Sequence, residues 1–125
     1  YNRLQTPEAT DRITKAGIET LLLSNGQLNV DELAGQLQIN RRQLERKFSS
    51  AIGLSPKQLS KFIRLQAALK MMNEGKFTSL TSLAYENGYY DQAHFIKDFK
   101  EFTGISPKQF YSGNLKMSKL FIETE

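Results

Sequence analysis

The stretch LERKFSSAIGLSPKQL, residues 44–59, returns later in the chain as FIKDFKEFTGISPKQF, residues 95–110. The offset is 51 positions (95 − 44), and phenylalanine, glycine, serine, proline, lysine and glutamine match in register. Just upstream, Leu33-Ala34 aligns with Leu83-Ala84 at an offset of 50, so the second copy has one extra residue, around residues 88–90. Chance explains these matches poorly, because they fall at helix caps and core positions. The chain is therefore predicted to contain one supersecondary unit twice.

Capping residues predict the first two helices of the first copy. Asn29 is followed three residues later by Glu32, which makes a capping box ahead of a helix over residues 30–37. Asn40 then caps a helix over residues 41–52. Two short helices joined by a tight turn are typical of a helix-turn-helix.

The same kind of signal predicts a long third helix and the plan of the second copy. Ser55 to Gln58 place an N-cap, a first-turn proline and a capping glutamine in order. That helix is expected to end at Glu74, with Gly75 as its stop. In the second copy the equivalent capping and ending positions are Ser79, Asp91, Gly104 and Ser106 to Gln109.

Helical spacing of apolar residues completes the fold prediction. A first helix is expected over residues 7–24, capped by Thr6 and ended by Asn25 and Gly26. The long helix is expected to bury one broad face, made of Leu59, Phe62, Ile63, Leu65, Gln66, Leu69 and Met72. No strand-like alternation occurs, so the fold class is all-α, with about seven helices. The predicted segments are a first helix-turn-helix subdomain (1–55), a linker helix (56–75), a second subdomain (76–113) and a tail (114–125).

Composition limits the function. Lysine and arginine number 17 against 13 acidic residues, a net charge of +4 that suits a polyanionic partner without proving one. There is no cysteine, and His94 is the only histidine, so we expect no metal, no cofactor and no enzymatic activity. No apolar run reaches the roughly 20 residues that span a bilayer. The chain opens on Tyr1 rather than methionine, so we expect a piece of a longer protein. Because neither a signal peptide nor a spanning run is visible, we expect that protein to be cytoplasmic.

The helix over residues 41–52 has the pattern of a recognition helix. Leu44 and Phe48 share its inward face, and the base-contacting candidates on its outward side are Arg41, Arg42, Glu45 and Arg46. Arginine can bind guanine O6 and N7, and glutamate can accept from cytosine N4. The alternative, a charged face that only meets solvent, stays open.

The equivalent helix of the second copy has a less polar outward face. Phe95 and Phe99 face the core, and the base-contacting candidates are Gln92, Ala93, Ile96 and Lys97. Glutamine can pair with adenine, and an apolar side chain can contact a thymine methyl group. For Ile96 the alternative is packing against neighbouring helix residues, and for His94 it is a surface or capping role.

Contacts with phosphate groups position such a domain without specifying sequence. The candidates are the lysines, the helix caps and the histidine: Asn40, Lys47, Lys57, Asp91, His94, Lys100 and Lys108. For the lysines, solubility is the alternative explanation.

The long helix spans about 27 Å at 1.5 Å per residue. Two recognition helices can use successive major grooves when they lie about 34 Å apart. The unequal copies then predict an asymmetric DNA site.

These residues resemble the AraC/XylS family of bacterial regulators. The likeness runs from about residue 12 to residue 112 and is densest over residues 84–100, followed by Gly104 to Phe110. It implies sequence-specific promoter binding by a helix-turn-helix module, with Arg42, Glu45 and Arg46 contacting bases in the first unit. It also implies RNA polymerase as a partner, an effector or dimerisation domain elsewhere in the protein, and no membrane contact. The family often has arginine where Lys97 stands, and the tail, with a possible docking helix, lies beyond the likeness.

Two other classes of function compete with DNA binding. An enzyme is disfavoured, because neither a phosphate-binding glycine loop nor a histidine-acid-nucleophile set can be assembled. Some relatives attach this module to a DNA-repair methyltransferase, but that chemistry needs cysteines. A helical protein-interaction module without DNA affinity is the more serious alternative.

Overall fold

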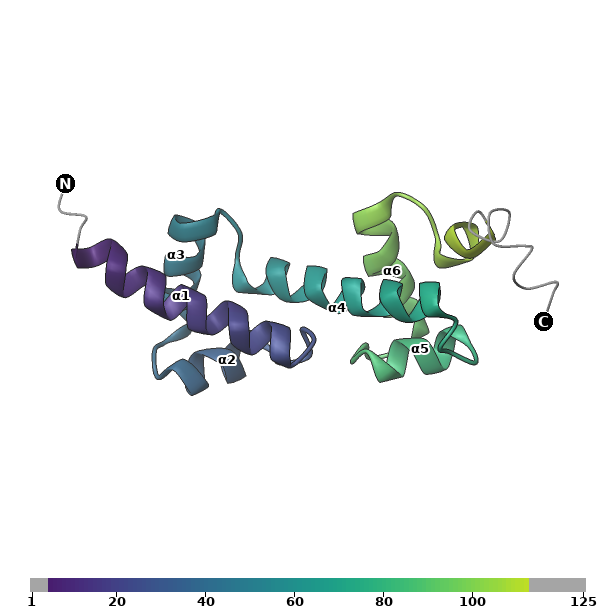
Figure 1. Ribbon diagram of the computed structural model, residues 1–125, viewed down its shortest axis with the longest axis horizontal. Helices are drawn as coiled ribbons and strands as arrows, with labels where there is room; N and C mark the ends of the chain where they lie inside the picture. Colours follow the sequence, from purple (N-terminus) through teal and green to yellow (C-terminus); the bar gives the residue numbers. More distant parts are fainter. Residues whose placement is uncertain (1–4, 113–125) are drawn as a thin grey trace. The chain divides into compact units, whose positions relative to one another are not determined.

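The structure, a computed structural model, describes the backbone of residues 5–112 and the side chains of residues 12–112 (Figure 1). The described part contains helices and connecting turns, without a strand, as expected for an all-α fold. Residues 107–112 form a further helical segment. The six bounded helices are α1 (Gln5–Leu23), α2 (Val30–Leu37), α3 (Arg41–Ile52), α4 (Pro56–Glu74), α5 (Leu80–Glu86) and α6 (Gln92–Thr103).

The chain divides into two compact units, Tyr1–Ala67 and Ala68–Glu125, and the division falls inside α4. Each unit therefore contains a helix-turn-helix together with half of α4. The expected three-segment division, with a separate linker over residues 56–75, stays a prediction. The expected docking helix in the tail over residues 114–125 lies outside the described residues.

In the first unit, α1 packs against both α2 and α3, and α2 packs against α3. The centre of this unit is aliphatic around one aromatic ring, that of Phe48, which is fully buried. Such burial contributes about 25 cal/mol for each Å² of apolar surface removed from water. The buried residues of this core are Leu21, Val30, Leu33, Ala34, Leu44, Phe48 and Ile63.

Two glycines permit close packing in the first unit. A Cβ on Gly17 of α1 would lie 2.9 Å from Cζ of Phe48, so α1 and α3 approach closely there. Gly26, at φ +72°, follows α1, and its carbonyl accepts hydrogen bonds from Ser60 Oγ (2.8 Å) and from Arg64 Nε (3.1 Å) and Nη2 (2.8 Å). This contact fixes the end of α1 against the first half of α4.

In the second unit, α5 packs against α6 and the core is aromatic. Ring centroids lie 5.1 Å apart for Tyr89 and Phe95, 5.7 Å for Phe95 and Phe99, and 5.5 Å for Phe99 and Phe110. Tilted and edge-to-face pairs at this spacing are favourable because ring edges and faces have opposite partial charge. Phe110, in the segment after α6, thus extends the core that begins in the turn before α6.

The predicted caps from Asn29 onward are confirmed. Asn29 and Glu32 form a reciprocal capping box, and the Asn40 side chain accepts from Gln43 N at 2.8 Å. Ser55 with Gln58, and Ser106 with Gln109, form the same reciprocal pair at the two buried prolines. Ser79 and Asp91 cap the second unit's helices, and Gly53, Gly75 and Gly104 have the left-handed backbone that ends a helix. From Asn29 to Asn40 the caps are eleven residues apart and from Ser79 to Asp91 twelve, which confirms the extra residue.

Two local predictions were wrong. Helix α1 begins at Gln5, so Thr6 is inside it and does not cap it; Pro7 is tolerated there because amides of a first turn have no helical acceptor. Phe62 and Gln66 of α4 are exposed, Phe62 by 44%. The reason is that α4 does not bury one stripe throughout: positions 56, 60 and 63 in its first half and 65, 68 and 72 in its second lie on different faces.

Candidate nucleic-acid interface

Helix α3 is fixed in register by its cap and by two buried side chains. Asn40 and Gln43 hold its first turn, where Gln43 Oε1 accepts from Asn40 N at 3.3 Å. Leu44 and Phe48 are fully buried beneath it. Because these two residues define the inward face, the opposite face must meet solvent or a ligand.

Three predicted base-contacting residues, Arg42, Glu45 and Arg46, are exposed on α3. Arg46 also lines an open hollow of about 480 Å³ beside the same helix. Two of the described lining residues are cationic, Arg46 and Lys47, which suits a polyanionic ligand. The lining residues are Gln43, Arg46, Lys47, Ser49 and Ser50.

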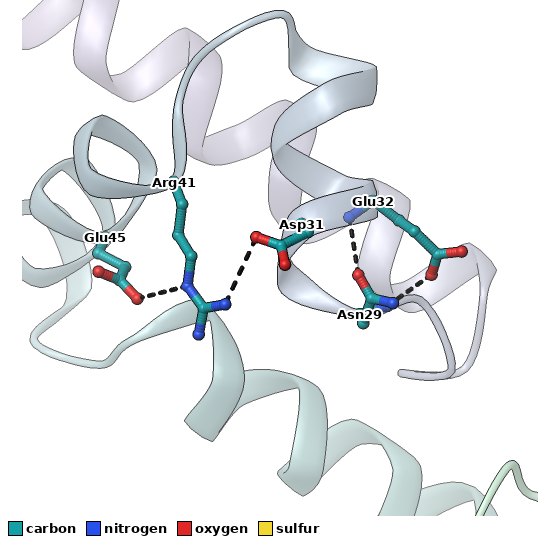
Figure 2. A network of polar contacts seen from close by, with 5 residues as sticks. All are labelled: Asn29, Asp31, Glu32, Arg41 and Glu45. Carbon is teal, nitrogen blue, oxygen red and sulfur yellow. Dashed lines mark hydrogen bonds and ion pairs between the residues drawn. The ribbon is translucent and has the colours of Figure 1, made fainter.

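Arg41 is held by two carboxylates on the other flank of α3, as Figure 2 shows. Its Nε donates to Glu45 Oε2 at 3.1 Å, and its Nη1 donates to Asp31 Oδ1 of α2 at 3.4 Å. The hydrogen bond with Glu45, together with the charge of both carboxylates, raises the pKa of Arg41 above its usual value. The structure thus brings Arg41 and Glu45 together, and it adds Asp31, which was not among the predicted site residues.

Helix α6 is built in the same way around Phe95 and Phe99, both fully buried. Its candidates differ in exposure: Ala93 and Lys97 are exposed, whereas Gln92 and Ile96 are half-buried. The Gln92 side chain is held by a neighbour from α5, because Thr81 Oγ1 donates to Gln92 Oε1 at 2.7 Å. Thr81 was also missed in the sequence.

His94 faces the body of the second unit on one side. Its ring is perpendicular to that of Tyr89 at a centroid distance of 5.5 Å, and its Nε2 lies 3.9 Å from Oδ2 of the buried Asp98. His94 and Asp98 are four residues apart on one helix, so their proximity could have been predicted from the sequence. The environment of His94 is therefore partly internal, and a role in contacting phosphate stays a prediction.

The candidates for phosphate contact fall into two groups. Asn40 and Asp91 use a side-chain oxygen to accept from Gln43 N and His94 N, so both are occupied as helix caps. Among the lysines, Lys47 is half-buried and the other three are exposed: Lys57, Lys100 and Lys108.

Within the described residues, no group of three or more histidine, aspartate or glutamate side chains is placed to hold a metal ion. No helix in that part of the chain has the length and apolarity needed to cross a membrane.

Comparison with known proteins identifies the class of this fold. A family model described as a helix-turn-helix domain matches residues 33–112. An uncharacterized HTH-type transcriptional regulator of Haemophilus influenzae is 31% identical over 99 residues, covering 79% of this chain and 33% of that protein. The HTH-type transcriptional regulator MtrA of Neisseria gonorrhoeae is 33% identical over 82 residues, covering 66% and 27%. The chain thus spans about a third or less of the length of these relatives.

Solved structures agree on the fold. The C-terminal domain of AraT, a response regulator from Geobacillus stearothermophilus, has a TM-score of 0.74 at 23% identity, over 81% of this chain and 84% of that one. The DNA-binding domain of AdpA, a global transcriptional factor solved in complex with a target DNA, has a TM-score of 0.70 at 22% identity, over 86% and 94%. The chain is a double helix-turn-helix domain, and it belongs to the AraC type of helix-turn-helix transcription regulators. It is thus a DNA-binding module of a transcription regulator.

Proposed function

We propose that this domain binds an asymmetric promoter site, with α3 and α6 in successive major grooves. The observation that carries the proposal is the repeated helix-turn-helix itself. In each copy, buried residues fix one face of the second helix. The other face has charged side chains on α3 and both polar and apolar ones on α6. A second helix of this kind is the element that enters the major groove in helix-turn-helix proteins.

In this proposal the first unit provides most of the base contacts. Arg42 and Arg46 bind guanine through paired donors, and Glu45 accepts from a base with an amino group. In the second unit, Lys97 and the half-buried Gln92 and Ile96 form a less polar surface, so we infer fewer base-specific hydrogen bonds there. The exposed lysines Lys57, Lys100 and Lys108 contact phosphates.

The lengths of the relatives support the inference that this domain is part of a longer protein. Because this chain matches about a third or less of each, we infer that the module works within a longer regulator that also has an effector or dimerisation part. Such a regulator acts in the cytoplasm, at the nucleoid, and RNA polymerase is its expected protein partner.

The test is selection of the 125-residue chain against a randomised duplex library, followed by affinity measurements at two salt concentrations. We expect an enriched asymmetric motif with two blocks about one helical turn apart. We also expect affinity to fall steeply with salt, because bound phosphates release counterions. A single enriched block would refute the tandem arrangement. If the chain showed no enriched motif and no salt-dependent binding, the result would instead support a protein-interaction module.

A further inference from the structure

The two helix-turn-helix units make the same inter-helix contact with different chemistry. In the first, Asp31, the second residue of α2, accepts from Arg41, the first residue of α3. In the second, Thr81, the second residue of α5, donates to Gln92, the first residue of α6. The offsets, 50 (81 − 31) and 51 (92 − 41), are those of the repeat. The first unit has an ion pair and the second a neutral hydrogen bond at equivalent positions. A contact between these two positions is therefore a common feature of both units.

Within residues 12–112, only the first unit extends the contact to a third residue. Arg41 uses Nη1 for Asp31 and Nε for Glu45, so a single planar guanidinium joins α2 to the outward side of α3 (Figure 2). Exposed ion pairs taken singly contribute little, but several charges in one network restrict one another. The hydrogen bond uses Oε2 of Glu45, and a carboxylate has further acceptor sites for another donor.

The network also reduces the electrostatic repulsion between the Glu45 carboxylate and DNA phosphates. A carboxylate on a helix that approaches DNA is repelled by phosphates, and the guanidinium beside Glu45 offsets that repulsion. Glutamate in the major groove can accept a hydrogen bond from cytosine N4. A glutamate with its charge balanced and its rotation restricted is thus suited to this contact.

We propose that Asp31 is a positioning residue for base recognition, which holds Arg41 so that Arg41 orients Glu45 toward the amino group of a cytosine. The inference rests on the proposed function. Arg41 then serves to hold Glu45 rather than to contact a base. Asp31 lies on α2, outside the recognition helix, and acts only through the two residues of α3.

The second unit supplies an internal comparison. The position equivalent to Glu45 is Ile96, which is half-buried and has no polar atom on its side chain (96 − 45 = 51). The contact from Thr81 therefore ends at Gln92. Positioning of an acidic side chain by the first helix is expected in the first half of the DNA site only.

The experiment uses the 125-residue chain on the site obtained by selection. The base pair contacted by Glu45 is assigned first, as the position whose preference changes in Glu45→Gln. Preference for cytosine there is then measured by competition for Asp31→Asn and for a matched control, Glu19→Gln. Glu19 is an exposed residue of α1, and its substitution removes the same charge. Ratios of affinities cancel any uniform gain from the lost negative charge.

We expect Asp31→Asn to lower the cytosine preference about twofold to fivefold, the range that exposed ion pairs support. Glu19→Gln should leave the preference unchanged. In a Glu45→Gln background, Asp31→Asn should have no further effect on that preference, because residues that act through one another are not additive. A residue needed only for folding would lower affinity at all positions alike.

Three results would overturn the inference: equal behaviour of Asp31→Asn and Glu19→Gln, an undiminished effect of Asp31→Asn in the Glu45→Gln background, or no base position that responds to Glu45→Gln. Each of these leaves selective DNA binding by the parent chain intact. Loss of the proposed function itself is distinguishable, because the parent chain would then select no motif.

Discussion

The first helix-turn-helix unit has an aliphatic core and a charged recognition helix. The second unit has an aromatic core and a recognition helix with a more apolar outward face. Phe48 is the buried ring of α3, while Tyr89, Phe95 and Phe99 pack together around α6. The turns differ as well, since the second unit has one more residue between its caps and places Tyr89 in that turn. A common backbone plan thus accepts two different sets of side chains, provided that caps and buried positions are kept.

The comparison also separates what builds the unit from what uses it. Most positions that match between the copies are caps, buried prolines or core residues, and these fix the helices. The exposed lysines Lys57 and Lys108 match as well. The outward faces differ between the copies, since Arg46 corresponds to Lys97 and Glu45 to Ile96. Buried positions differ as well, since Leu44 corresponds to Phe95. The difference in DNA contacts should therefore be measurable by substituting equivalent positions in pairs.

The largest effect is expected from the glycines that follow α1 and end α4. A Cβ at Gly26 would lie 2.4 Å from the Ser60 carbonyl oxygen, whereas a Cβ at Gly75 meets nothing within 4 Å. Both have positive φ, which costs an L-residue about 1–2 kcal/mol. Gly75→Ala should lower the free energy of unfolding by that amount, and Gly26→Ala by about 3 kcal/mol or more. Urea unfolding followed by circular dichroism tests this, and equal losses would contradict the close contact with α4.

The next effect concerns base contacts at equivalent positions. Arg46→Ala should cost about 1–3 kcal/mol of binding free energy on the selected site, mainly at one base position. Lys97→Ala should cost less than about 1 kcal/mol, because a flexible lysine lacks the rigid planar pair of donors that arginine presents to guanine. Both variants remove one positive charge, so their affinities for a non-specific duplex should fall alike. If Lys97→Ala lost as much selectivity as Arg46→Ala, the second unit would be an equal partner in base recognition.

A smaller and more uniform effect is expected from two exposed lysines. Lys57 and Lys108 each follow a buried proline at the start of a helical segment. Replacing either with alanine should lower the slope of log affinity against log salt by about one, on any duplex sequence. The matched control is Lys15→Ala on α1, for which we expect no change in slope. A change confined to one base position would show that the lysine contacts a base.

The smallest effect is expected from exchanging the caps of the two recognition helices. Asn and Asp cap helices about equally well, so Asn40→Asp and Asp91→Asn should leave the free energy of unfolding nearly unchanged. Their effects on DNA affinity should be opposite, about twofold to fivefold weaker for Asn40→Asp and stronger for Asp91→Asn. The reason is that one charge near a phosphate in water is worth about 1 kcal/mol or less. Titrations at low salt test the pair, and a change of the same sign in both would contradict a position near phosphates.

The sequence predicted most of the helix boundaries, because capping is local. Asn29, Asn40, Ser55 and Asp91 bond to amides only three residues away, so the pattern and the structure agree. The exception is the start of α1, where a proline is compatible with several positions of a first turn. The exposed face of α3 was also predictable, since Leu44 and Phe48 mark its inward side.

The sequence did not predict which outward side chains are held by other helices. The partners of the site, Asp31 for Arg41 and Thr81 for Gln92, come from the preceding helix, ten and eleven residues earlier. Helical spacing places residues on a face but does not say where another helix crosses it. For the same reason, the exposure of Phe62 and Gln66 on α4 could not be inferred from a single apolar stripe.

The sequence by itself thus determined the tandem unit, its caps and the buried side of each recognition helix, because these depend on interactions within one helical turn and on a repeat visible in the chain. The tertiary structure alone decided that Gly26 is clamped by Ser60 and Arg64, 34 and 38 residues away. It also decided that Arg41 is shared between Asp31 and Glu45. Such contacts depend on where separate helices meet, and packing fixes that only once the chain has folded.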